Sequence, residues 1–148
     1  MPSPAQRADV ALFAELSAID RLAAIHIERL LPGQLSSAHF GVLGRVATEP
    51  GLSPGQLAKA LALSRPTMTH ALTRLDAAGL IAIAADTDDR RRKRVSITKA
   101  GEAAYAKGAA ALTPMLQALR TSFPADDFAQ VLPFLNRLRA WLQAGAQT

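Results

Sequence analysis

The chain has 148 residues, 49% of them apolar and 5% aromatic, and a formal net charge of +5. It is long enough for one hydrophobic core and too short for two independent catalytic domains. The absence of cysteine excludes disulfides, thiolate metal sites and cysteine-based redox sensing. No apolar run approaches the roughly 18 residues of a membrane span and no signal-peptide pattern opens the chain, so we expect a cytoplasmic protein.

Residues 5 to about 31 predict one long helix. Apolar residues recur at a spacing of three from Val10 to Ile25, and Pro32-Gly33 ends the pattern. The apolar face is wider than one small core needs, so we expect part of it to pack on a second subunit. The alternative is that the helix only covers its own core.

Three shorter helices are predicted next from their start signals. Ser36 can cap a helix that runs through Val46. Residues 53–56 (Ser-Pro-Gly-Gln) combine a capping Ser, Pro at the first helical position and Gln at the capping-box position, which predicts a helix of about two turns. Ser64 can cap a further helix that ends at Gly79, where a left-handed residue is favoured.

The helix after Ser64 has two chemically different faces. Met68, Leu72 and Leu75 occupy its inner face. The opposite face is polar and consists of Arg65, Thr67, Thr69, His70, Thr73 and Arg74. Two short helices joined by a tight turn, the second with such a face, predict a helix-turn-helix.

The hydrophobic period changes from 3.6 to 2 directly after Gly79. Residues 80–84 predict a strand, 86–89 a turn and 94–98 the return strand. Five consecutive cations, residues 90–94, equal the whole net charge because the other basic and acidic residues balance. A basic hairpin of this kind beside a recognition helix is typical of a wing.

Two more helices are predicted after the hairpin. Thr98 can cap an Ala-rich helix in which Pro114 should bend or interrupt the backbone. A last helix from about Pro124 to Gln143 carries an apolar stripe, and Pro133 inside it should introduce a kink.

Three segments of the predicted helix-turn-helix resemble the recognition-helix region of the MarR family of transcriptional regulators. They are residues 57–58 (Leu-Ala), 63–69 (Leu-Ser-Arg-Pro-Thr-Met-Thr) and 75–80 (Leu-Asp-Ala-Ala-Gly-Leu). Residues 86–101 are similar to that family's wing and the start of its next helix, and Asp89 and Arg91 match its Asp-Xaa-Arg element. Two departures are His70, where many relatives carry Arg, and Asp88, where a basic residue is frequent.

The resemblance implies a mainly α fold with a small β-hairpin and a single domain over residues 1–148. The winged helix-turn-helix lobe would span about 36–101, with the wing at about 80–98, and helices at about 5–34 and 102–146 would form a homodimer. The dimer would bind an inverted-repeat operator in double-stranded DNA. Many members of the family lose DNA affinity when a small aromatic or anionic ligand, an oxidant or a metal binds.

The predicted helix after Ser64 would read bases in the major groove. Arg91 is the first choice for insertion into the minor groove. We expect Asp89 to hold the wing by pairing with an Arg, and Ser64 to serve mainly as a cap. The predicted DNA-binding residues are Ser64, Arg65, Thr67, Thr69, His70, Arg74, Arg90, Arg91, Arg92 and Lys93.

No catalytic, cofactor or metal site is predicted. The three histidines lack paired ligand spacing, and no phosphate loop or nucleophile elbow is present. An effector pocket would lie between the dimerisation helices and the lobe, with His26, His39 and Phe40 as candidates for its lining. The alternative functions are a winged-helix protein-interaction module, an architectural DNA binder and, with least support, an enzyme.

Overall fold

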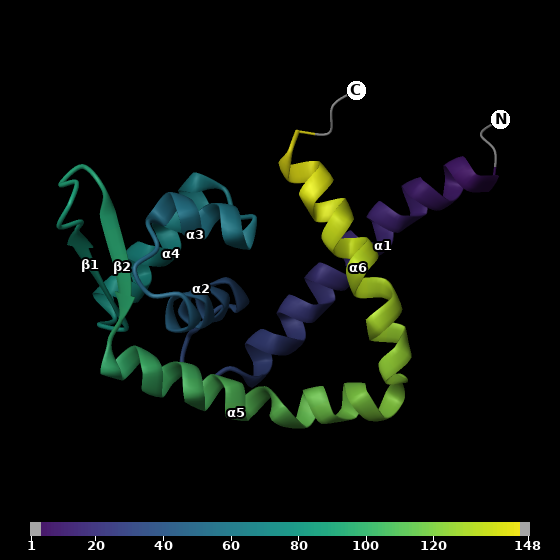
Figure 1. Ribbon diagram of the computed structural model, residues 1–148. Coiled ribbons are helices and arrows are strands. Elements are labelled where there is room, and N and C mark those ends of the chain that lie inside the picture. Colours follow the sequence, from purple (N-terminus) through teal and green to yellow (C-terminus); the bar gives the residue numbers. More distant parts are fainter. Residues whose placement is uncertain (1–3, 146–148) are drawn as a thin grey trace. The chain divides into compact units, whose positions relative to one another are not determined.

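The computed structural model describes residues 4–145, and side chains from residue 7 onward. In chain order the elements are α1 (Pro4–Leu30), α2 (Ser37–Thr48), α3 (Pro54–Leu61), α4 (Arg65–Ala77), β1 (Ile81–Ala85), β2 (Lys93–Ile97), α5 (Lys99–Ser122) and α6 (Ala125–Gln143) (Figure 1). The backbone forms two compact units that divide within α5, between Leu112 and Thr113. The predicted mainly α fold with one small hairpin is confirmed.

Serine side chains start the three helices of the lobe, as predicted. Ser36, Ser53 and Ser64 are the N-caps of α2, α3 and α4, and each side chain accepts a hydrogen bond from the backbone N–H three residues later. These bonds satisfy donors that a helix cannot pair internally. The third residue of α2 is His39, whose Nδ1 accepts from the Ser36 N–H at 3.3 Å, so an imidazole completes a capping box there.

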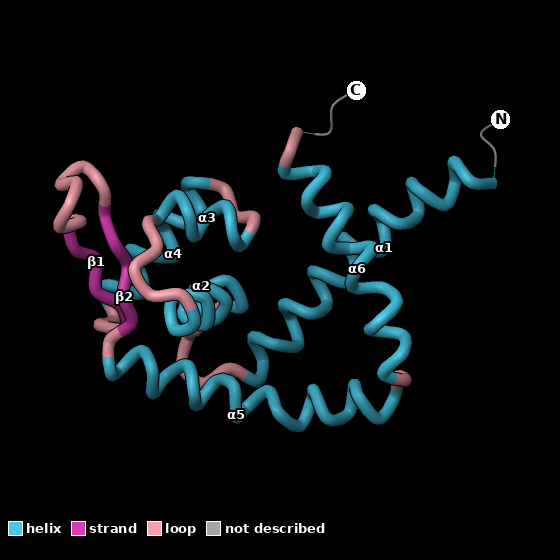
Figure 2. The backbone as a smooth tube through the Cα atoms, viewed as in Figure 1, coloured by secondary structure: helices cyan, strands magenta, loops and turns pink. Residues whose placement is uncertain are grey.

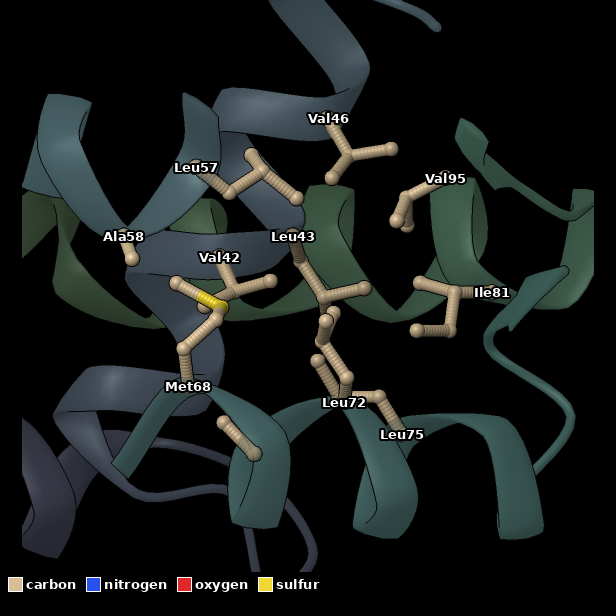
Figure 3. Close-up of a cluster of buried hydrophobic side chains, with 11 residues drawn as sticks. Val42, Leu43, Val46, Leu57, Ala58, Met68, Leu72, Leu75, Ile81 and Val95 are labelled. Carbon is tan, nitrogen blue, oxygen red and sulfur yellow. The ribbon is translucent and has the colours of Figure 1, made fainter. Parts of the chain in front are cut away.

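The core of the first unit lies between α2, α3, α4 and the hairpin (Figure 3). Met68, Leu72 and Leu75 of α4 face into it, as their spacing predicted. Burial of this set supplies the main free energy that holds the lobe together. The buried cluster consists of Val42, Leu43, Val46, Leu57, Ala58, Met68, Ala71, Leu72, Leu75, Ile81 and Val95.

Strands β1 and β2 form a hairpin (Figure 2). The strands are antiparallel, with Ile81 opposite Ile97 and Ala85 opposite Lys93. The free edge of β2 is bonded to the loop before α3: the Gly51 N–H donates to the Val95 carbonyl, and the Val95 N–H donates to the Leu52 carbonyl. These bonds fix the base of the hairpin against the helix-turn-helix.

Thr98 joins the end of α4 to the start of α5. Its hydroxyl donates to the Gly79 carbonyl at 2.6 Å and accepts from the Gly101 N–H at 3.0 Å, which confirms the predicted cap. Gly79 has a φ of +72°, the left-handed conformation expected after a helix. A Cβ at Gly101 would overlap the Leu80 carbonyl, so only glycine fits this close approach.

Of the two outcomes predicted at Pro114, the interruption is wrong, because α5 continues through it to Ser122, and the bend stays a prediction. Proline removes one backbone donor from a helix, but the remaining bonds of a 24-residue helix carry it past that position. The last helix also runs unbroken through Pro133. The kink expected there stays a prediction.

Candidate nucleic-acid interface

The N-terminus of α4 is held by Ser64. Its Oγ accepts from the Thr67 N–H at 3.2 Å and donates to the Thr67 hydroxyl at 2.7 Å. The turn before it passes through Ala62, which has a φ of +53°, and the Leu63 N–H donates to the Ala58 carbonyl. This tight turn sets α4 against α3 and leaves the first turn of α4 at the surface.

The outward face of α4 is polar and exposed, as the sequence predicted. Arg65, Thr67, Thr69, His70, Thr73 and Arg74 are all exposed. The Thr73 hydroxyl donates to the Thr69 carbonyl at 2.8 Å and is thereby engaged within the helix. The other side chains of this face extend from a helix whose opposite side is buried in the core.

The wing consists of β1, the loop 86–92 and β2. The Asp86 N–H donates to the Arg92 carbonyl, and the Arg92 N–H donates to the Asp89 carbonyl, so the loop is closed by its own backbone. Asp89 accepts from the Arg91 N–H at 3.0 Å and lies 3.8 Å from Arg92 Nε. The carboxylate that the sequence assigned to wing structure therefore contacts the backbone of Arg91 and the side chain of Arg92, while the Arg90 and Arg91 side chains are exposed.

A second carboxylate at the wing base was missed by sequence reasoning. Asp86 Oδ2 lies 3.1 Å from Arg94 Nε, and only 12% of the Asp86 side chain is exposed. The backbone N–H of Asp88 and the Arg94 guanidinium together hold the pKa of Asp86 below its ordinary value. Asp86 is therefore ionised at neutral pH and anchors Arg94.

A basic hollow of about 650 Å³ lies between the first turn of α3, Arg65 and the wing base. Sequence reasoning assigned Arg65, Arg92 and Lys93 to DNA binding but passed over Lys59 and Arg94, which line the same hollow. Their spacing along the chain carries no signal that they converge, because the convergence depends on the packing of β2 against the loop before α3.

A second hollow of about 500 Å³ lies behind α4. It is lined by His39 and Arg74 together with the loop after α1 and the C-terminal end of α4. Burial lowers the pKa of His39 from 6.5, and electrostatic interactions with Arg74 and His70 lower it further, while Glu28 opposes them. His39 is therefore mostly neutral at neutral pH, as its role as an acceptor in the α2 cap requires.

The three residues suggested for an effector pocket are not brought together in this hollow. His39 lines it, whereas Phe40 stacks on Tyr105 with ring centroids 5.1 Å apart. The Phe40 ring lies where a Cβ on Gly108 would be, so it packs α2 against α5. His26 is exposed on α1 and does not line the hollow.

Within residues 4–145, no group of three or more His, Cys, Asp or Glu side chains is placed to hold a metal ion. Among the described helices, none has both the length and the apolar character to cross a membrane.

Comparison with known proteins identifies the fold. Residues 34–92 match the sequence profile of the MarR family. A probable transcriptional regulator from Pseudomonas aeruginosa is 25% identical, with 88% of this chain and 98% of that chain covered and a TM-score of 0.77. The transcriptional regulator BldR from Sulfolobus solfataricus is 22% identical, with 94% and 99% covered and a TM-score of 0.82.

A third structure concerns the regulation of DNA binding by a small molecule. BpsR from Bordetella bronchiseptica, whose DNA binding is regulated by 6-hydroxynicotinic acid, is 21% identical, with 84% of this chain and 90% of that chain covered and a TM-score of 0.75. Together these matches confirm the resemblance to the MarR family and the winged-helix fold. The first two of these proteins are described as transcriptional regulators, the Pseudomonas protein as a probable one.

Proposed function

From this resemblance to the MarR regulators, we propose that the chain is a transcriptional regulator that binds double-stranded DNA sequence-specifically. It acts as a homodimeric repressor. One observation carries the proposal: the exposed polar face of α4 and a wing with five consecutive cations lie on the same lobe (Figure 1). The groups that read bases and the groups that bind phosphate are thus present together.

In this proposal α4 enters the major groove, which is wide enough for a helix and distinguishes all four base pairs. Thr67, Thr69 and His70 meet base edges near the N-terminus of the helix. Arg65 and Arg74 reach guanine or phosphate, and Ser64 contributes the N-terminal turn, whose dipole attracts phosphate. The exposure of this face supports the assignment.

The wing lies along the adjacent minor groove, with Arg91 inserted. A narrow A·T-rich minor groove concentrates negative potential and attracts a guanidinium. Arg90, Arg92 and Lys93 contact phosphates, while Asp89 holds the loop through the Arg91 N–H. The exposure of Arg91 at a loop closed by its own backbone bonds supports this role.

The terminal helices form the dimer. Each of the two units exposes large apolar side chains: Val10 of α1 is 71% exposed and Trp141 of α6 is 52% exposed. Exposed apolar patches mark interfaces in many proteins, so these side chains support the assignment. A twofold dimer presents two α4 helices, which matches an inverted repeat.

A small ligand modulates DNA affinity in this proposal. The hollow of about 500 Å³ behind α4 has the size of a small-molecule site, and Arg74 belongs both to its wall and to the polar face of α4. Arg74 and apolar walls suit an anionic aromatic compound. The reported control of BpsR by 6-hydroxynicotinic acid supports this class of regulator.

The first experiment is selection of bound fragments from the genomic DNA of the source organism, at near-physiological salt with non-specific competitor. An enriched inverted repeat with half-sites about one helical turn apart is the expected result. Binding without a motif would favour an architectural DNA binder, and absence of binding would favour a protein-interaction module.

Two variants then separate base readout from phosphate contact. Thr69→Ala should change the preferred base pair at one position of each half-site, by about 1–3 kcal/mol. Arg90→Ala should weaken binding to all sequences alike and lower the salt slope by about 0.9 for each subunit. Thr121→Ala, which removes an exposed threonine of α5, is the matched control and should change neither readout.

A further inference from the structure

The basic hollow between α3, Arg65 and the wing base carries a strong excess of positive charge. Five cations line it, Lys59, Arg65, Arg92, Lys93 and Arg94, against one carboxylate, Asp86. They come from α3, α4 and the wing, so only the folded lobe gathers them. A volume of about 650 Å³ lies in the range of ligand-binding sites.

The first turn of α3 adds a backbone donor to this wall. The Ser53 N–H donates to Gln56 Oε1, the Gln56 N–H to Ser53 Oγ and the Leu57 N–H to the Ser53 carbonyl. Pro54 has no N–H. Within the described residues, the Gly55 N–H is therefore the one donor of this turn that has no partner.

Gly55 also leaves room for an oxygen atom to approach that donor. A Cβ built on Gly55 would meet only Ser53 Oγ, at 4.0 Å, so the space beside this backbone is open. A helix N-terminus carries partial positive charge, and a glycine there allows close approach of an anion. Asp86 pairs with Arg94 at 3.1 Å, which keeps that guanidinium at the wall.

We propose that this hollow seats a phosphate of the DNA backbone between the helix-turn-helix and the wing. The Gly55 N–H and the Arg65 guanidinium bind the phosphate oxygens, and Lys93 and Arg94 complete the positive wall. Asp86 acts as a positioning residue through Arg94. The inference rests on the proposed function and adds to it a contact that fixes the angle of the wing against α4.

The first test uses inorganic pyrophosphate as the probe, at constant ionic strength, with the ¹⁵N-labelled full chain. The Gly55 amide resonance should shift saturably. Arg65→Ala should raise the pyrophosphate Kd by about threefold or more, as expected for one exposed ionic contact. Lys107→Ala removes an exposed cation of α5 outside the hollow and should leave the Kd unchanged. A Gly55 resonance that does not respond would overturn the proposal.

The second test separates DNA phosphate from free phosphate compounds. Single neutral methylphosphonate linkages are scanned through a half-site of the selected fragment, with wild type and Arg65→Ala. One linkage should weaken wild-type binding and weaken the variant no further, the non-additivity expected of two groups in contact. Additive losses of binding free energy at every linkage would overturn the proposal that a DNA phosphate binds in the hollow, even if pyrophosphate binds there. Failure to select any fragment would count against the proposed function. The titration followed at Gly55 would then test by itself whether the hollow binds a phosphate group.

Discussion

The winged-helix lobe and the terminal helices differ in how far they bury their apolar side chains. The lobe buries a cluster in which Leu43 and Val95 have no exposed surface. In α6 no residue is buried, and the described side chains of α1 are all exposed or half-buried. The lobe therefore buries its apolar side chains within one chain, whereas the apolar side chains left exposed on the terminal helices support the proposed dimer.

Helix capping differs between the same two regions. The lobe helices α2, α3 and α4 begin at serines that bond the first turn, whereas α6 begins at Pro124 with no side-chain cap. The lobe helices therefore carry local start signals in their own sequence, and α6 lacks such a signal at its start.

The largest expected effect is on the lobe core. Leu43→Ala should lower the free energy of unfolding by about 3 kcal/mol, because it removes buried methyl groups and leaves a cavity. Urea unfolding followed by circular dichroism measures the change as a lower midpoint. Leu132→Ala, at a position that is 53% exposed, is the matched control.

The comparison predicts how these two variants respond to dilution. The loss caused by Leu43→Ala should not depend on protein concentration, whereas any loss caused by Leu132→Ala should, because a dimer contact is linked to concentration. Equal losses from both variants at every concentration would contradict the division between a complete lobe and partner-dependent helices.

The second prediction concerns α1. Leu22→Asp places a charge on a side chain that is 57% exposed in the single chain and should reduce the mass seen by light scattering from twice 15.6 kDa towards 15.6 kDa. Ser17→Asp introduces the same charge at an exposed polar position of the same helix and should leave more dimer. A wild-type chain that remains monomeric would remove the basis of the prediction.

Local signals predicted much of this fold from the sequence. Ser53 with Gln56 and Ser64 with its following helix mark their helix starts because a cap is decided by neighbouring residues. The hairpin followed from the change of period after Gly79. The polar face of α4 followed because the core residues Met68, Leu72 and Leu75 fix which side of the helix is outside.

Features that depend on tertiary packing could not be predicted from the sequence. The Asp86–Arg94 pair requires the register that places Ala85 opposite Lys93, and neither residue alone reveals it. The basic hollow requires the bonds from Gly51 and Val95 that hold the wing base near α3. His39 looked like a candidate ligand-binding group, but its ring caps α2 because Ser36 lies three residues before it.

The third prediction tests capping in the two regions. Ser64→Ala removes the acceptor for the Thr67 N–H and should cost about 1 kcal/mol of stability. Pro124→Ser supplies a cap that α6 lacks and should gain up to about 1 kcal/mol. Chemical denaturation measures both changes. Loss of stability in Pro124→Ser would show that the proline ring matters more there than the missing cap.

The smallest expected effect is a pH dependence from His39. Because its pKa in the folded chain is lowered from 6.5, the folded state binds a proton less tightly than the unfolded state. The stability contribution is therefore full above pH 6.5 and is lost as the pH falls through the lowered pKa. Protonation at Nδ1 would also remove the acceptor for the Ser36 N–H.

His39→Gln isolates this contribution, since glutamine at the third helical position keeps an acceptor for the Ser36 N–H without a titrating group. Stability of the variant, measured by urea denaturation between pH 7.5 and pH 5, should decline less than that of wild type. If the two proteins lose stability equally as the pH falls, the α2 cap tolerates a protonated imidazole and the prediction is wrong.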